Sequence, residues 1–115
     1  MNKIPITVLI PTKNEERNIR PCLNPLIGWA DQIIVVDSNS KDDTIKIVKS
    51  FSEIETVKFI YNGGWPKKRQ WALDNLNIRN EWVLLLDVDE ILLPGVKNEI
   101  GSLIEENRHD GFYIF

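Results

Sequence analysis

A short apolar run that leads into a cluster of carboxylates constrains this chain more than any other feature: Trp82-Val-Leu-Leu-Leu-Asp-Val-Asp-Glu90. The run is too short for a typical helix, and turn-forming residues precede it, so it predicts a buried central strand. Ligands of open α/β sheets bind beyond the carboxyl ends of the strands, which is where Asp87 and Asp89 fall.

The two aspartates suggest a metal site. On an extended chain that rises about 3.3 Å per residue, side chains at i and i+2 point to one side, roughly 7 Å apart. Hard divalent cations prefer carboxylate oxygens, so Asp87 and Asp89 suit one. The alternative, an acidic solvated loop that caps the next helix, stays open on this motif alone.

Composition fits one ordinary globular domain that spans residues 1–115, with 43% hydrophobic and 27% charged residues. The net charge of -3 gives no sign of the excess of basic residues that is typical of nucleic-acid-binding proteins. No apolar run exceeds five residues, far short of a bilayer span, and the N-terminus lacks a signal-peptide core.

The single cysteine, Cys22, fits a reducing cytoplasm and a buried core thiol. His109 stands in a polar loop, so neither a zinc site nor a Ser-His-Asp triad has support.

The first half of the chain predicts a strand followed by a helix. Ile4–Pro11 is rich in β-branched residues, and Thr12-Lys-Asn-Glu15 matches the capping box that opens a helix. Helical spacing follows, and we expect Pro25 to kink or interrupt the helix. The apolar residues at that spacing are Ile19, Cys22, Leu23, Leu26 and Ile27.

Strands and helices alternate along the remaining sequence. Further strands are predicted at Ile33–Val36, Thr56–Tyr61 and Gly111–Phe115. Pro66 suits the first turn of a helix, and Pro94-Gly95 should break the chain before a last helix. The alternation predicts an α/β fold with a mostly parallel sheet flanked by helices. The sequence lacks the glycine-rich motifs of dinucleotide-binding Rossmann units and P-loops. Apolar helix faces are expected at Ile45, Val48 and Phe51, and at Val96, Ile100, Leu103 and Ile104.

The predicted last strand would be an exposed edge unless something covers it. Either a second copy of the chain pairs with it in a homo-oligomer, or the chain is the front part of a larger domain.

Charged clusters follow three strands, at Thr12–Glu16, Asp37–Asp43 and Asp87–Glu90, and Lys67–Arg69 opens a helix. Together they suggest a site for an anion and a cation. A carboxylate about 4 Å from a phosphate costs about 4 kcal/mol at an effective dielectric near 20, and a bridging Mg²⁺ or Mn²⁺ reverses that. The plain interpretations are that the carboxylates of Asp42 and Asp43 only begin a helix and that Lys67–Arg69 is a solvated face. Asp37 directly follows an apolar strand, where a ligand-facing residue is expected.

Four segments in this order resemble a known family: Ile10–Ile19, Val35–Thr44, Lys68–Leu73 and Leu84–Glu90. The chain resembles the N-terminal part of an inverting family 2 glycosyltransferase. It is most similar to bacterial enzymes that add a sugar during lipopolysaccharide core synthesis. The resemblance implies the Rossmann-like, nucleotide-binding half of a GT-A fold.

The resemblance also implies roles for particular residues. Asp89 would coordinate Mn²⁺ or Mg²⁺ at the diphosphate, and Asp37 would hydrogen-bond the base, typically uracil. Asp87 would contact the ribose or the sugar. The implied nucleotide-sugar-binding set is Pro11, Thr12, Glu15, Asp37, Lys68, Arg69 and Asp87.

The implied function is transfer of a sugar from a UDP-sugar to a saccharide or lipid-linked acceptor, by a cytoplasmic enzyme that can associate peripherally with the inner face of a membrane. The chain departs from the family at Lys68-Arg69-Gln70, where the basic residue is usually followed by Asn. Family members are also longer, and their second half supplies the catalytic base. We therefore expect a donor- and metal-binding half with little or no transfer activity alone.

Three rival functions fit parts of the sequence. A haloacid dehalogenase-like phosphatase would use Asp87 as nucleophile and Asp89 as acid, but its motif normally opens the domain. A phospho-receiver domain needs an acidic pair after the first strand, where this chain has Pro11-Thr12-Lys13. A nucleotide-binding module without catalysis is the third alternative, and the short length of the chain relative to the family supports it.

Overall fold

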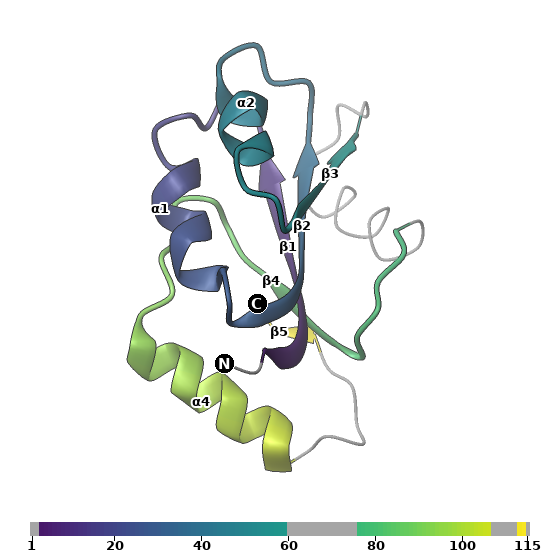
Figure 1. Cartoon of the computed structure of the whole chain (residues 1–115), viewed down its shortest axis with the longest axis vertical. Coiled ribbons are helices and arrows are strands. Elements are labelled where there is room, and N and C mark those ends of the chain that lie inside the picture. Colours follow the sequence, from purple (N-terminus) through teal and green to yellow (C-terminus); the bar gives the residue numbers. More distant parts are fainter. Residues whose placement is uncertain (1–2, 60–75, 107–112, 115) are drawn as a thin grey trace.

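The computed structural model of the chain describes residues 3–59, 76–106 and 113–114 (Figure 1). Its centre is a five-stranded sheet in the order β3-β2-β1-β4-β5, in which every neighbouring pair is parallel. The predicted α/β fold with a parallel sheet is confirmed. The strands are β1 (Ile4–Thr12), β2 (Ala30–Asp37), β3 (Ile54–Lys58), β4 (Trp82–Leu85) and β5 (Tyr113–Ile114).

The central strand is β1, which pairs with both β2 and β4. Leu9 stands opposite Ile34 on one side and Leu85 on the other. Because β2 and β3 lie on one side of β1 while β4 and β5 lie on the other, the order reverses between β1 and β4. This reversal is the topological switch point of the sheet.

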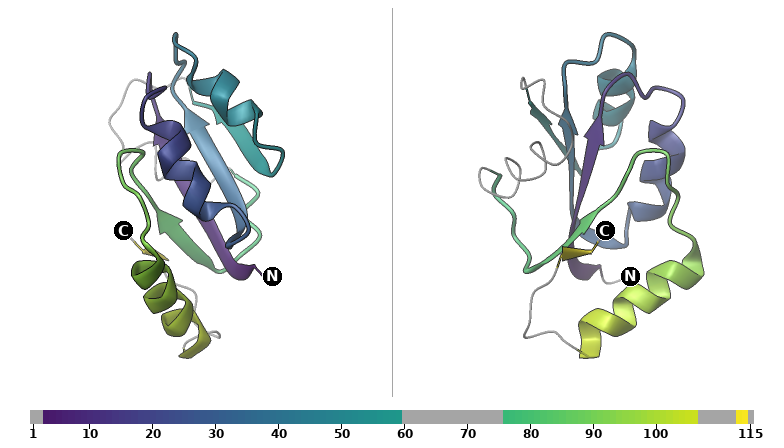
Figure 2. Two further views of the ribbon diagram at one scale, coloured as in Figure 1. Left: turned by 60° about the vertical axis from the view of Figure 1, so that its left-hand side comes forward. Right: turned by 180° about the vertical axis from the view of Figure 1, so that it is seen from behind.

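All described helices cover one face of the sheet, as the two views of Figure 2 show. Apolar side chains of β1 such as Val8 and Ile10 pack there against the helices, and the alternate positions, including Leu9, form a second cluster on the opposite face. Both faces of β1 and β2 are buried, which explains their continuous apolar sequences. The helices are α1 (Ile19–Leu23), the 3₁₀ helix η1 (Asn24–Leu26), α2 (Thr44–Lys49) and α4 (Pro94–Glu106).

The predicted capping box at Thr12–Glu15 is wrong. Thr12 is the last residue of β1, and its hydroxyl donates to Asp37 Oδ1 at 2.6 Å. Asn14 adopts φ 54°, a left-handed conformation that a helix does not allow. The helix begins only at Ile19, because Thr12 is engaged by the neighbouring strand and not by an amide of its own loop.

The predicted interruption at Pro25 is confirmed. Helix α1 ends at Leu23 and Pro25 lies in η1, where a tighter turn accommodates the missing amide. In contrast, Pro94 does not break the chain before the last helix. It is the first residue of α4, where a fixed φ and an absent N–H are tolerated.

One strand boundary and one apolar helix face differ from the prediction. Strand β3 runs over Ile54–Lys58, two residues earlier than expected, because it pairs in register with β2 from Ile33 to Asp37. In α4 the apolar face is narrower than predicted: Ile100 and Ile104 are buried, while Val96 is 42% and Leu103 43% exposed. The helix near Pro66 lies outside the described residues. No helix of the described part has the length and apolar character that a membrane span requires.

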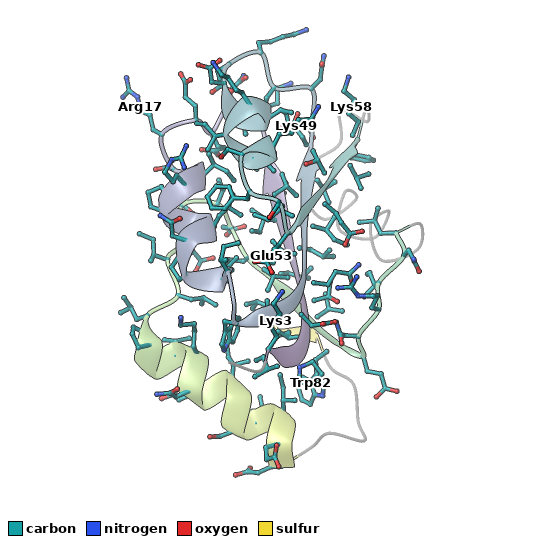
Figure 3. All side chains as sticks on the ribbon, viewed as in Figure 1. Lys3, Arg17, Lys49, Glu53, Lys58 and Trp82 are labelled. Carbon is teal, nitrogen blue, oxygen red and sulfur yellow. The ribbon has the colours of Figure 1, made fainter. Side chains whose placement is uncertain are left out.

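A buried polar network fastens the amino end of the sheet. Gln32 is 2% exposed and uses all four of its hydrogen-bonding positions. Its Oε1 accepts from the Thr7 hydroxyl and the Arg79 amide, both at 2.8 Å, and its Nε2 donates to Glu55 Oε2 and to the Asn77 carbonyl. The segment that leads into β4 is thereby tied to β1 and β2. Trp82 lies near this end of the sheet, while Arg17 and Lys58 lie near the other (Figure 3).

We expect Gln32→Ala to lower the free energy of unfolding by about 3 kcal/mol, since it removes the acceptor of both the buried Thr7 hydroxyl and the Arg79 amide. Urea denaturation followed by circular dichroism measures the change. The matched control is Asn77→Ala, because only the main-chain carbonyl of Asn77 takes part, and its effect should stay within about 0.5 kcal/mol. Equal midpoints for the two variants would contradict the role of the network.

Cys22 is a buried core thiol, as predicted from its apolar neighbours. Its Sγ lies 4.0 Å from the carbonyl oxygen of Asp87, below the turn that follows β4. Burial, followed by the negative charges of Glu90 and Asp89, raises the pKa of this thiol from about 9 to about 12. The folded state therefore holds a neutral, unreactive thiol.

Alkylation of Cys22 by iodoacetamide at pH 8 should be slow in the native chain and fast in urea. The folded pKa is raised above the unfolded one, so the thiol's contribution to stability is complete below about pH 8.5 and falls as pH rises toward about 12. Unfolding midpoints at pH 8, 10 and 11, compared with those of Cys22→Ala, isolate this contribution. A native alkylation rate equal to that in urea would refute the buried neutral thiol.

Candidate functional site

A pocket of about 330 Å³ opens at the switch point, beyond the carboxyl ends of β1 and β4. Crossover connections leave β1 and β4 in different directions, which opens a crevice where ligands of such sheets bind. Four of the residues singled out from the sequence meet in it. The lining residues are Pro11, Glu15, Asn18, Asp87, Val88 and Asp89.

The acidic side of the pocket is a turn after β4. Strand β4 ends at Leu85, and the Asp87 carbonyl accepts the Glu90 amide at 3.0 Å. Asp87 and Asp89 are exposed, while Val88 between them is buried in the core. The aspartates were expected on an extended chain and instead lie in a turn, because the strand stops early. They still line one pocket, since Val88 anchors the turn.

The opposite side of the pocket comes from the loop between β1 and α1. The Glu15 carbonyl accepts the amides of Asn18 and Ile19 at 3.0 and 2.9 Å, which starts α1. Asn18 Nδ2 donates to Glu15 Oε1 at 3.2 Å. These bonds hold Glu15, a predicted site residue, across the pocket from the aspartates.

Asp37 and Thr12 meet, but beneath the surface. Asp37 is the last residue of β2 and is 1% exposed. Its Oδ1 accepts the hydroxyls of Thr12 and Ser40 at 2.6 and 2.5 Å, and its Oδ2 accepts the Ser40 amide at 2.8 Å. The carboxylate is therefore held in one orientation by β1 and by its own loop. Its contact with a base stays a prediction.

Asp42 does more than begin a helix. Its Oδ1 accepts the amide of Thr44 at 3.0 Å, as the plain interpretation expected, but its Oδ2 also accepts the amide of Glu16 at 3.2 Å. Desolvation raises the pKa of Asp42, and hydrogen bonds from Thr44 and Glu16 outweigh it, so the pKa lies below its usual value. Asp42 thus stays ionised and joins two loops.

The acidic side chains fit a divalent cation that is shared with a ligand. Asp87 and Asp89 offer exposed carboxylate oxygens in the same pocket as Glu15. In the described residues no group of three histidine, cysteine or acidic side chains is close enough to hold a metal by itself. Mg²⁺ is commonly held by one or two carboxylates, substrate phosphates and water, so the donor set suits that arrangement.

The basic members of the predicted set, Lys68 and Arg69, lie outside the described residues. Asn18, which lines the pocket, was missed by the sequence reasoning, as were the residues that bridge the two loops. The spacing Asp37-x-x-Ser40 is typical of an aspartate that accepts an amide three residues on, and it could have indicated Ser40.

Comparisons with known proteins agree with this geometry. A profile described as Glycosyl transferase family 2 matches residues 7–114. An uncharacterized glycosyltransferase of Rickettsia typhi is 32% identical over 110 residues, which are 96% of this chain and 36% of that protein. The SPbeta prophage-derived glycosyltransferase SunS of Bacillus subtilis is 31% identical over 101 residues, which are 85% of this chain and 23% of SunS.

A solved structure shares the fold. The crystal structure of S. aureus TarS 1-349 matches with a TM-score of 0.76 and 27% identity, over 91% of this chain and 33% of TarS. The chain thus spans about a third or less of the length of these relatives. Since the profile matches nearly every residue and the switch-point pocket carries the expected carboxylates, the chain belongs to glycosyl transferase family 2.

Proposed function

We propose that this chain is the donor-binding part of a glycosyltransferase that moves a sugar from a nucleoside-diphosphate sugar to a saccharide or lipid-linked acceptor. The observation that carries the proposal is the convergence of Pro11, Glu15, Asp87 and Asp89 on one pocket at the switch point. Family membership gives the reaction class and leaves the phosphatase and receiver alternatives without support.

The negative charge of the pocket favours metal-dependent binding of the donor. Three carboxylates, those of Glu15, Asp87 and Asp89, line a space in which a diphosphate would be repelled. A Mn²⁺ or Mg²⁺ ion held by Asp89, with Asp87 nearby, would supply positive charge for the diphosphate. We assign the nucleotide to UDP on the strength of Asp37, whose anchored carboxylate is an acceptor suited to a ring N–H of uracil.

The acceptor and the catalytic base are not assigned to residues of this chain. Glu90 directly follows Asp89, but its carboxylate accepts the Asp87 amide at 3.2 Å and so holds the turn together. The chain should therefore bind a nucleoside diphosphate without transferring sugar. A lipid-linked acceptor would bring the enzyme to the inner face of a membrane from the cytoplasm.

Calorimetric titration with UDP should show binding in Mn²⁺ and its loss in EDTA. Asp89→Asn keeps the size of the side chain and removes its charge, and it should weaken UDP binding by about tenfold or more, as expected when a charged partner is lost. Asp89 is exposed, so the variant should fold normally.

The control for that titration is Glu105→Gln, which removes one carboxylate charge from an exposed position of α4 outside the pocket. It should bind UDP as the unaltered chain does. An equal loss of UDP affinity in Asp89→Asn and Glu105→Gln would mean that the change in net charge alone causes the effect. UDP binding that is unchanged in EDTA would reject the metal, and absence of binding both in Mn²⁺ and in EDTA would reject the chain as a donor site.

A further inference from the structure

Three successive amides of the β1–α1 loop are bonded to the β2–α2 loop and to Thr44, the first residue of α2. The Asn14 amide donates to Ser40 Oγ at 2.8 Å, the Glu15 amide to Thr44 Oγ1 at 2.8 Å, and the Glu16 amide to Asp42 Oδ2 at 3.2 Å. An unbroken run of amides satisfied by one neighbouring segment, residues 40–44, is a specific arrangement, because loop amides otherwise bond to water or to their own turn.

Two of the hydroxyls pass the interaction on to a carboxylate. Ser40 Oγ accepts from Asn14 and donates to Asp37 Oδ1 at 2.5 Å. Thr44 Oγ1 accepts from Glu15 and donates to Asp42 Oδ1 at 2.5 Å. Each hydroxyl thus uses its single proton toward an aspartate, and chains of this kind strengthen their members mutually.

The bonds also run in the reverse direction. Asn14 Oδ1 accepts the Lys41 amide at 2.7 Å, and Glu16 Oε2 accepts the Asp43 amide at 3.3 Å. Asn14 and Asn39 both adopt left-handed conformations, with φ of 54° and 57°. Strained residues of this kind persist where surrounding bonds determine the loop. We call the hydrogen bonds that join Asn14 and Glu16 to the β2–α2 loop, which contains Ser40, the loop clamp.

We propose that Asn14 and Ser40 are positioning residues that join the two loops into one unit, so that the buried Asp37 and the pocket residue Glu15 keep a fixed relative placement for the donor. This inference rests on the proposed donor site. Neither residue lines the pocket, so each acts through another residue: Ser40 through Asp37, and Asn14 through the backbone that carries Glu15.

The two carboxylate oxygens of Asp37 differ in the number of hydrogen bonds that they accept from the chain. Oδ1 accepts two hydroxyls and has no lone pair left, whereas Oδ2 accepts one amide. Loss of the Ser40 hydroxyl would leave Oδ1 with the Thr12 hydroxyl as its one donor from the chain and would weaken the hold on the carboxylate. Donor affinity should therefore depend on Ser40 although Ser40 touches no donor atom.

The test uses paired variants of the 115-residue chain. Ser40→Ala removes the relay and Ser40→Thr keeps the hydroxyl. Asn14→Gly keeps the left-handed backbone and loses the acceptor for Lys41, while Asn14→Asp keeps the acceptor. UDP affinity in Mn²⁺ should fall about tenfold in Ser40→Ala and Asn14→Gly and stay within about twofold of the unaltered chain in the conservative variants.

Amide hydrogen exchange gives a readout that needs no ligand. In Ser40→Ala the amides of residues 14–16 should exchange faster together with those of the β2–α2 loop. Gln32→Ala, which weakens the fold from the amino end of the sheet, should leave the protection of residues 14–16 relative to the rest unchanged.

The outcomes separate the two proposals. Faster exchange confined to the β2–α2 loop in Ser40→Ala overturns the clamp, and so does a loss of UDP affinity in Gln32→Ala equal to that in Ser40→Ala. Failure of the conservative variants to restore affinity overturns it as well. Coupled exchange in a chain that binds no UDP supports the clamp and rejects the proposed donor site.

Discussion

The parallel pairing of β1 with β2 on one side and β4 on the other is the constraint on which the structure depends. It places the ends of three strands at one edge of the sheet, and it puts the switch point between β1 and β4. Loops leaving β1 and β2 toward the helical face stay close enough to bond, while the turn after β4 stands apart and opens the pocket. The carboxylates meet because the sheet is ordered in this way.

Much of this fold could be predicted from the sequence, because strands buried on both faces have a distinctive composition. The runs at Ile33–Val36 and Trp82–Leu86 have no polar residue, and they form the interior strands β2 and β4 on either side of β1. The capping box failed because Thr12 has a better partner in Asp37, 25 positions away. A local pattern gives no sign of such a partner, and it is the tertiary bond that turns a helix cap into the end of a strand.

The same contrast between local patterns and long-range bonds applies to the residues of the site. Asp87 and Asp89 were found because they directly follow a recognisable strand, and Glu15 came from the resemblance to the family. Asn14 and Ser40 were missed because their bonds join residues 26 and 27 positions apart. Only one of the two contacts of Asp42 could be predicted. Its hydrogen bond to Thr44 is local, whereas its hydrogen bond to Glu16 depends on the packing of β1 beside β2.

Aspartates at the ends of two strands perform different tasks because their surroundings differ. The carboxylate of Asp37 is enclosed and accepts two hydroxyls and an amide from the chain itself, so its charge is compensated and its orientation fixed. The carboxylates of Asp87 and Asp89 face solvent, so their oxygens are available to a cation. The Asp37 carboxylate is therefore held in one orientation, whereas Asp87 and Asp89 supply exposed negative charge. The bonds between the loops after β1 and β2 keep Asp37 at a constant separation from Glu15, which lines the same pocket as Asp87 and Asp89.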